Sequence, residues 1–324
     1  MFCKGAPQGS LLGPFAYNVF FNDLLFLMNK ICTIYNYADD NTILCTGNNV
    51  SDVRNKMENA LQVLIQWFNN NSMKVNPDKF QVIFFDRKNS CANEYLMINN
   101  IKIVHQPTVK LLGMYIDCKL NFDEHVREIC RKAGFKLNVL ARLSKTLDEE
   151  AKLLLFHSFI LSYFKYCCPV WVFCDLPSIR VIEKIQERAL RFVYNDFRST
   201  YSDLCAKSGI SLLCVQRLRS LLEEVHKCVK KEGPCYMHAL FMLKQNKYCL
   251  KNEISLELPH HDTVRYGFQS MRYFGAKLYN SLSYDLKSHD TTKFKKMIKC
   301  WYPSECNCLN SSCILCKIQQ NWSP

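Results

Sequence analysis

Glycine and proline are scarce in this chain of 324 residues, at 10 each, which argues against long flexible linkers. No apolar run reaches the ~18 residues that a membrane-spanning helix needs, because polar side chains interrupt the two longest runs, 19–28 and 153–173. Residues 1–7 also lack the apolar core and cleavage site of a secretory signal. We therefore expect an intracellular protein of the cytoplasm or nucleus that is neither secreted nor bound to a membrane.

The chain does contain an ordinary globular share of hydrophobic residues, 48%. That share excludes wholesale disorder, and the length is enough for about two domains. Cysteine is abundant, at 19 residues. Without an export signal, these thiols should stay reduced.

A cysteine cluster near the end follows the spacing C-x-C-x₄-C-x₂-C. Its members are Cys306, Cys308, Cys313 and Cys316. Closely spaced thiolates are typical ligands of a tetrahedral Zn²⁺ site, and the x₂ pair has a usual spacing for zinc. The x₁ pair does not, so a metal-free tail in a cysteine-rich chain is the other open interpretation.

Positive charge is concentrated after residue 123. The formal net charge is +13, yet residues 1–123 carry 11 basic and 10 acidic side chains. A one-sided basic surface attracts polyanions, nucleic acid first and acidic membrane second, although a merely solvated surface is the alternative. The residues that we expect to contact nucleic acid lie on the polar faces of two predicted helices: Arg188, Arg191, Arg217 and Arg219.

The first part of the chain predicts alternating helices and strands, and the whole chain an α+β fold. Apolar residues at steps of three and four after Gly9 predict a half-buried helix. Its predicted inner face consists of Leu12, Phe15, Ala16, Val19, Phe20 and Leu24. β-forming residues on both sides of 38–41 predict a hairpin, and a helix capped by Ser51 or Asp52 follows. Strands are predicted at 79–86 and 110–117.

After residue 122 the apolar spacing is helical. We expect helices at 124–143, 148–173, 177–194 and 215–231, the third with Pro177 in its first turn, where the missing N–H costs nothing.

Two adjacent carboxylates, Asp39 and Asp40, stand at the tip of the predicted hairpin after Tyr37 and Ala38. Such carboxylates repel each other, and a divalent cation that prefers hard oxygen ligands, such as Mg²⁺, relieves the repulsion. Both reach one ion only if the turn breaks the alternation of side chains along the strand. By itself the dipeptide is a weak signal, because aspartate is a common turn residue.

Several segments, taken in order, resemble reverse transcriptases. Residues 5–14, Gly-Ala-Pro-Gln-Gly-Ser-Leu-Leu-Gly-Pro, followed by Tyr-Ala-Asp-Asp at 37–40, resemble the polymerase palm. Residues 67–85 resemble the next palm motif, and residues 110–125 the primer-grip region. Later segments resemble the carboxy-terminal half of non-LTR retrotransposon polymerases of the jockey-like group: 166–171, 185–191 and 266–277.

The resemblance implies RNA-directed DNA synthesis with an RNA template, a DNA primer and Mg²⁺. Asp39 matches the metal-binding aspartate of the family, with Asp40 beside it, and Lys79 matches the lysine proposed as proton donor to pyrophosphate. The residues that match template-primer and nucleotide contacts are Gln8, Gly9, Tyr37, Ala38, Leu112 and Gly113. The plain alternatives are a helix-entry turn at 8–9, a solvated Lys79 and a core strand at 112–113.

The family also has an upstream strand with a third metal-binding aspartate, and fingers that bind the incoming nucleotide. The sequence begins just before the Pro-Gln-Gly segment, so we expect the rear of a polymerase that does not synthesise DNA alone. The expected parts are a partial palm at 1–120, a helical thumb and connection at 121–235, and a basic, cysteine-containing tail at 236–324. Whether the chain is an enzyme stays open between an inactive truncated fragment, the rear half of a working enzyme, and a non-catalytic nucleic-acid-binding module.

Overall fold

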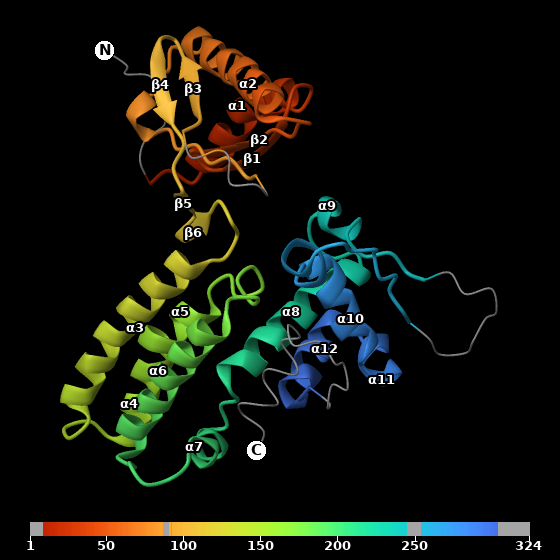
Figure 1. The fold of residues 1–324 in the computed structure, drawn as a ribbon. Coiled ribbons are helices and arrows are strands. Elements are labelled where there is room, and N and C mark those ends of the chain that lie inside the picture. Colours follow the sequence, from red (N-terminus) through yellow and green to blue (C-terminus); the bar gives the residue numbers. More distant parts are fainter. Residues whose placement is uncertain (1–8, 87–90, 92, 245–253, 304–324) are drawn as a thin grey trace. The chain divides into compact units, whose positions relative to one another are not determined.

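The computed structural model describes residues 9–86, 91, 93–244 and 254–303. The chain separates into two compact units, Met1–Leu120 and Asn121–Pro324. All named strands lie in the first unit and form small antiparallel hairpins, whereas the second unit is helical, which confirms the α+β class (Figure 1). Among the described helices, none is both long and apolar enough to cross a membrane.

The first helix of unit 1, α1 (Gly13–Met28), buries Phe21, Leu24 and Met28. The inner face predicted for this helix is wrong apart from Leu24, since Phe15, for example, is 68% exposed. The exposed members of that predicted face are Leu12, Phe15, Ala16, Val19 and Phe20. Apolar residues surround this helix on all sides, so their spacing alone does not select a face, and packing against the next helix does.

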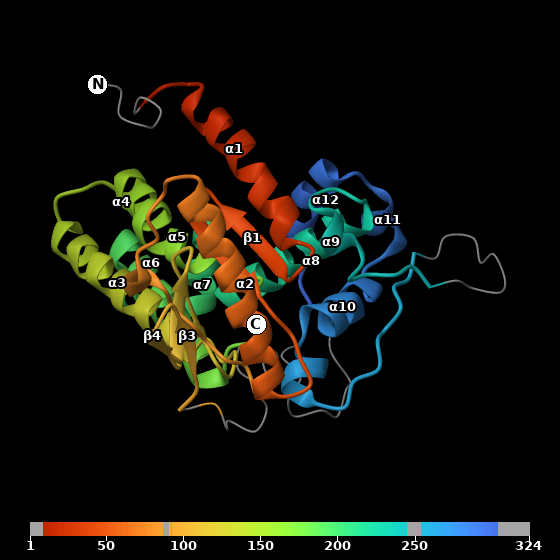
Figure 2. The same cartoon turned by 90° about the horizontal axis from the view of Figure 1, so that it is seen from above.

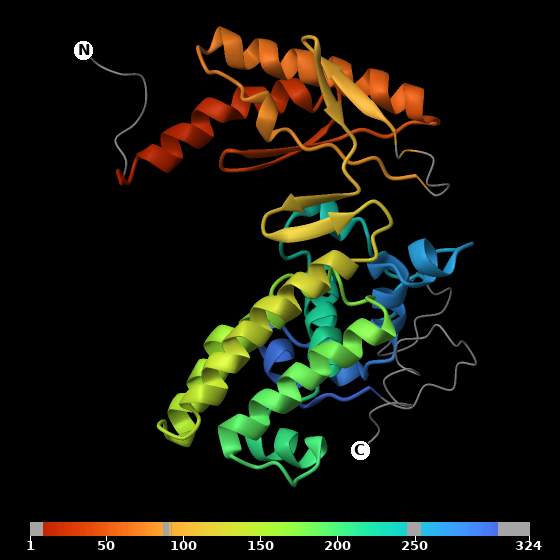
Figure 3. The same cartoon turned by 60° about the vertical axis from the view of Figure 1, so that its left-hand side comes forward.

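That next helix, α2 (Val50–Asn70), begins after Asn49, whose side chain accepts a hydrogen bond from the Asp52 N–H at 2.8 Å. The predicted caps, Ser51 and Asp52, therefore lie inside the helix. The indole N–H of Trp67 donates to Asp23 of α1 at 3.3 Å. Helix α2 thus lies beside both α1 and one of the hairpins (Figure 3).

The three hairpins of unit 1 are β1 (Thr33–Tyr37) with β2 (Asp40–Leu44), β3 (Tyr95–Ile98) with β4 (Ile101–Val104), and β5 (Thr108–Leu111) with β6 (Met114–Asp117). The first was predicted and is confirmed. The second was not predicted. The third replaces the single strand predicted at 110–117, because Leu112 and Gly113 both adopt positive φ and reverse the chain.

The strand predicted at 79–86 is also wrong. A short 3₁₀ turn, Pro77–Lys79, ends there, and Val82 forms one isolated parallel bridge with His105. The alternating apolar residues of this segment pack against the core of unit 1 without a neighbouring strand to complete a ladder among the described residues.

Unit 2 begins with a helical bundle. Its first elements are α3 (Asp123–Leu143), α4 (Glu149–Phe156), a π-helical turn (His157–Leu161), α5 (Ser162–Lys165) and α6 (Leu176–Tyr194). Helices α3, α4 and α6 run alongside one another (Figure 1). The helix predicted at 148–173 ends at Lys165, because Tyr166 is extended and Cys167 adopts a φ of 46°. Phe164 and Trp171 are fully buried, whereas Tyr166 is 48% exposed.

The rest of unit 2 is built on α8 (Leu213–Val229), which buries Leu218, Leu222 and Val225. The remaining helices are α7 (Tyr201–Ser208), α9 (Cys235–His238), α10 (Ala276–Asn280), α11 (Tyr284–Ser288) and α12 (Thr291–Met297). Both α10 and α12 pack against α8 (Figure 2). The assignment of these segments to a palm, a thumb and a tail stays a prediction.

Candidate functional site

The β1–β2 hairpin closes in a two-residue turn, Ala38 and Asp39, because Tyr37 pairs directly with Asp40. Side chains on the strands hold this turn. The Asn36 amide donates to the Ala38 carbonyl at 2.8 Å and to the Asn41 side chain at 2.9 Å, and the Asn41 amide donates to the Asp39 carbonyl at 3.4 Å. The tip therefore has a fixed backbone.

Ala38 adopts a φ of 52°, the left-handed region that favours glycine. A non-glycine residue held there costs roughly 1–3 kcal/mol, and such strain is concentrated at functional sites. The second central residue, Asp39, is not among the residues with a positive φ. The two carboxylates leave the backbone where the chain reverses direction.

Asp39 belongs to the turn and Asp40 to the first pair of the ladder, so the alternation of side chains is broken between them. Both residues are exposed, and none of the described residues forms an ion pair with either. Burial raises the pKa of Tyr17 on α1, and the negative charge of Asp39 is the second cause of that rise. Asp39 therefore lies near α1. The described residues contain no group of three or more acidic, histidine or cysteine side chains that could hold a metal ion.

The other predicted polymerase residues of unit 1 occupy different elements. Gln8 lies outside the described residues, while Gly9 stands in a turn before α1 with a φ of 82°. Lys79 is exposed at the end of its 3₁₀ turn. Leu112 and Gly113 form the β5–β6 turn, with φ values of 46° and 85°, and Leu112 is 42% exposed, which excludes the alternative of a simple core strand.

Two of the four arginines predicted to contact nucleic acid are buried. Arg217 is 1% exposed and Arg219 8%, so their predicted place on a polar outer face of α8 is wrong. Helix α8 is covered on several sides, since α6, α10 and α12 all pack against it. Basic side chains on a central helix are therefore drawn into the interior, and neither guanidinium is available to a phosphate.

Both buried guanidiniums have internal partners. Arg217 lies 3.2 Å from the Cys174 sulfur and 5.2 Å from the ring centroid of Trp171. Arg219 donates to the Trp301 carbonyl at 2.8 Å and to the Ser211 hydroxyl at 2.7 Å. These two arginines join α8 to neighbouring segments of unit 2.

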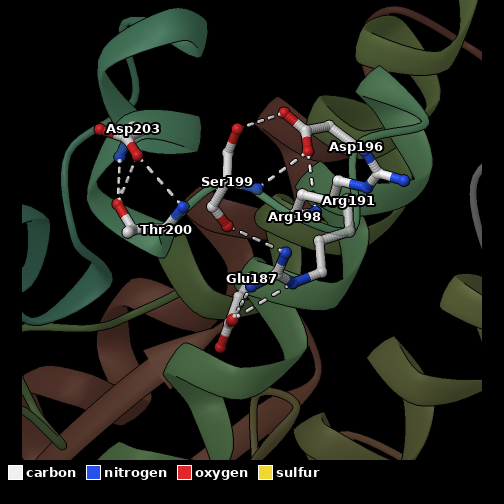
Figure 4. Close-up of polar contacts among 7 residues, drawn as sticks. All are labelled: Glu187, Arg191, Asp196, Arg198, Ser199, Thr200 and Asp203. Atoms are coloured by element: carbon white, nitrogen blue, oxygen red, sulfur yellow. Dashed lines mark hydrogen bonds and ion pairs between the residues drawn. The ribbon is translucent and has the colours of Figure 1, made fainter.

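Arg191 holds the loop between α6 and α7 (Figure 4). Its guanidinium pairs with Glu187 at 2.6 Å and donates to the Ser199 carbonyl at 3.1 Å. Asp196 accepts from the hydroxyl of Ser199 and from the backbone N–H groups of Ser199 and Arg198, and these bonds lower its pKa to about 2. Arg191 thus serves the structure of this loop.

Arg188 remains exposed, and it continues a stripe with Arg180 and Lys184 at steps of four residues along α6. From the sequence alone, these three residues could not be distinguished from the arginines that the structure buries. Helix α6 buries the opposite side, with Ile182 and Leu190 in the core. These three residues form an exposed basic stripe on α6.

The predicted zinc ligands Cys306, Cys308, Cys313 and Cys316 lie outside the described residues. A Zn²⁺ site there stays a prediction.

Comparison with known proteins supports the resemblance to reverse transcriptases. Residues 1–116 match the family model described as reverse transcriptase (RNA-dependent DNA polymerase). Over about half of its length the chain is similar to RNA-directed DNA polymerases of non-LTR retrotransposons. It is 31% identical over 156 residues to the RNA-directed DNA polymerase from mobile element jockey of Drosophila melanogaster, covering 46% of this chain and 16% of that protein.

Two further Drosophila melanogaster relatives align over 200 residues, or 58% of this chain. The probable RNA-directed DNA polymerase from transposon BS is 27% identical, with 22% of its length covered. The corresponding protein from transposon X-element is 24% identical, with 21% covered. The chain thus spans about a fifth of the length of these curated proteins. No solved structure matches it.

Proposed function

We propose that the chain is part of an RNA-directed DNA polymerase in which unit 1 supplies the rear of the palm and the β1–β2 tip supplies metal ligands. The observation that carries this proposal is the strained two-residue turn that presents Asp39 and Asp40, within residues that match the reverse transcriptase family. Template RNA and primer DNA are the proposed partners.

The donor set at the tip fits a divalent cation of the Mg²⁺ type. Two exposed carboxylates offer hard oxygen ligands, and the broken alternation lets both face one ion. A bound cation there would supply charge stabilisation for a transferring phosphoryl group. Two carboxylates make an incomplete site for a polymerase, so we propose that Asp39 and Asp40 bind the cation weakly and that the described residues alone do not catalyse incorporation.

The second observation concerns unit 2. Its exposed stripe of Arg180, Lys184 and Arg188 gives three positive charges on one helical face. Phosphate contacts of this kind bind without regard to sequence and weaken with salt. We propose this stripe, in place of Arg217 and Arg219, as the contact to the RNA–DNA duplex.

The test is a fluorescence anisotropy titration of a labelled RNA–DNA duplex at several salt concentrations. In the triple variant Arg180→Gln, Lys184→Gln, Arg188→Gln we expect the slope of log K against log salt to become shallower by about 2 to 3, because each lost phosphate contact contributes roughly 0.7–0.9. The variant Arg217→Met should leave the slope unchanged, since Arg217 is buried.

The charge-matched control is the triple variant Lys293→Gln, Lys295→Gln, Lys296→Gln on α12, which removes three exposed cations from another helix. We expect it to change the slope by less than 1. Equal losses in both triple variants would show that net charge, not the α6 stripe, carries the binding. An unchanged slope in the α6 variant would refute the placement.

A further inference from the structure

Two cysteines stand at the open end of the β1–β2 hairpin, opposite the aspartate turn. The last pair of the ladder joins Thr33 to Leu44, so Cys32 and Cys45 occupy the next cross-strand position. The sequence pattern gave neither residue a role.

The register places both cysteines on one face of the hairpin. Side chains of alternate pairs share a face, so Cys32 and Cys45 follow Ile34–Ile43 and Asn36–Asn41. The hydrogen bond of 2.9 Å between the Asn36 and Asn41 side chains shows that opposed residues on this face touch. Ile34 belongs to the core of unit 1, and the partly buried Ile43 packs against that core.

The pair also has the spacing that a disulfide requires. The residues that flank a two-residue turn exchange both backbone hydrogen bonds, and pairs alternate from there, so Cys32 and Cys45 form a non-hydrogen-bonded pair. Opposed Cα atoms in such pairs lie about 4.5 Å apart, at the near end of the range that disulfides span.

The two thiols already interact. Burial, together with the charge and hydrogen bond of Cys45, raises the pKa of Cys32 to about 11, and burial raises the pKa of Cys45 as well. Both residues remain partly accessible. A small disulfide in solution can therefore reach them, and their low thiolate fraction at neutral pH makes the exchange slow.

We propose that Cys32 and Cys45 are a reversible disulfide-forming pair that responds to small-molecule disulfides such as glutathione disulfide. The thiolate of one cysteine attacks glutathione disulfide, forms a mixed disulfide and releases one glutathione thiolate. The second cysteine then attacks the protein sulfur of that mixed disulfide and releases the other glutathione. Two protein thiols are oxidised, one glutathione disulfide is reduced, and both protons pass to the released glutathiones.

The new bond would tie together the two strand ends that are farthest from Asp39 and Asp40. It would close a short loop that contains the whole hairpin, which restrains the unfolded chain and suppresses local opening of the ladder. The inference rests on the hairpin register and on the proximity and accessibility of the two thiols, and it does not depend on polymerase activity.

The test is a mass measurement on the full chain. Trypsin cleaves after Lys30 and Arg54, and no lysine or arginine lies between them, so both cysteines fall in one peptide, 31–54. After incubation with glutathione disulfide, remaining thiols are blocked with N-ethylmaleimide under denaturing conditions before digestion. We expect peptide 31–54 from the oxidised protein to carry no maleimide and to be two hydrogens lighter than the unlabelled dithiol peptide. When the oxidised protein is reduced before the blocking step, the same peptide should carry two maleimides.

Cys235, which is exposed, serves as the internal reporter that glutathione disulfide has reacted. The matched variant is Leu44→Cys combined with Cys45→Ser, which moves the second thiol by one residue to the other face of the hairpin. It should yield no internal disulfide. Two retained maleimides, or glutathione left on Cys32 or Cys45, in a sample whose Cys235 has reacted would overturn the proposal. An internal disulfide in the shifted variant would do the same.

Discussion

Replacing Glu183 by alanine is expected to lower the free energy of unfolding by about 3 kcal/mol. Glu183 is 2% exposed on α6, yet its carboxylate has a complete set of donors. It accepts from the backbone N–H of Cys214 at 2.7 Å, from that of Leu213 at 3.2 Å, and from the hydroxyl of Tyr201 at 2.6 Å. The carboxylate thus caps the amino terminus of α8 from a neighbouring helix.

Alanine would leave two backbone N–H groups at the start of α8 without that acceptor in the interior, and would remove a negative charge from the positive end of the helix dipole. The measurement is a urea titration followed by far-UV circular dichroism. The control is Glu187→Ala, one turn later on α6, whose partly exposed carboxylate pairs with Arg191 and should contribute no more than about 1 kcal/mol. A loss for Glu183→Ala as small as that of the control would contradict this account of α8.

Between pH 7 and pH 5 the protein is expected to lose about 2 kcal/mol of stability through His226 alone. The imidazole is fully buried in unit 2. One ring nitrogen lies 3.0 Å from the Tyr279 hydroxyl, the other 3.1 Å from the His289 carbonyl, and the ring stacks on Phe294 with centroids 3.9 Å apart. The neutral tautomer that donates to the carbonyl and accepts from the hydroxyl satisfies both contacts.

Burial first, and the charge of Lys230 second, lower the pKa of His226 to about 4 in the folded chain. In the unfolded chain the pKa is about 6.5. The unfolded state therefore binds more protons between these values, so stability is complete above pH 6.5 and falls as the pH drops toward 4. Urea titrations at pH 7, 6 and 5 measure the slope.

Burial also lowers the pKa values of His105, His125 and His157, so part of the slope belongs to them. His226→Gln should reduce the loss between pH 7 and pH 5 by about 2 kcal/mol, whereas His260→Gln, at an exposed position, should not change it. A loss between pH 7 and pH 5 that is as large in His226→Gln as in the original chain would contradict the role of His226.

The sequence predicted helices best where apolar residues mark one face only. The helices expected at 124–143 and 177–194 are observed at Asp123–Leu143 and Leu176–Tyr194. In α1 the apolar residues surround the axis, so the existence of the helix could be predicted and its buried face could not. The helix expected at 148–173 ends at Lys165, and the indole N–H of the buried Trp171 donates to the carbonyl of the next residue, Tyr166, at 3.1 Å. No local apolar pattern expresses such a contact.

The hairpin with Asp39 and Asp40 was predictable because β-forming residues flank a short polar turn. The split of the strand expected at 110–117 depended on Leu112 accepting a positive φ, a conformation that leucine seldom adopts. The error over Arg217 and Arg219 has another cause. A helix that is packed on several sides buries part of its polar face too. The apolar spacing within one helix does not show which other helices pack against it.

The central claim is that the β1–β2 tip binds a divalent cation, and an electron paramagnetic resonance titration with Mn²⁺ tests it most directly. We expect Mg²⁺ to displace the bound Mn²⁺, and Asp39→Asn and Asp40→Asn each to weaken binding about tenfold, or 1.4 kcal/mol. The matched control is Glu149→Gln with Glu150→Gln, which removes an adjacent pair of exposed carboxylates from the first turn of α4 and should leave Mn²⁺ binding unchanged. Equal Mn²⁺ affinity in the original chain and in Asp39→Asn would contradict the account.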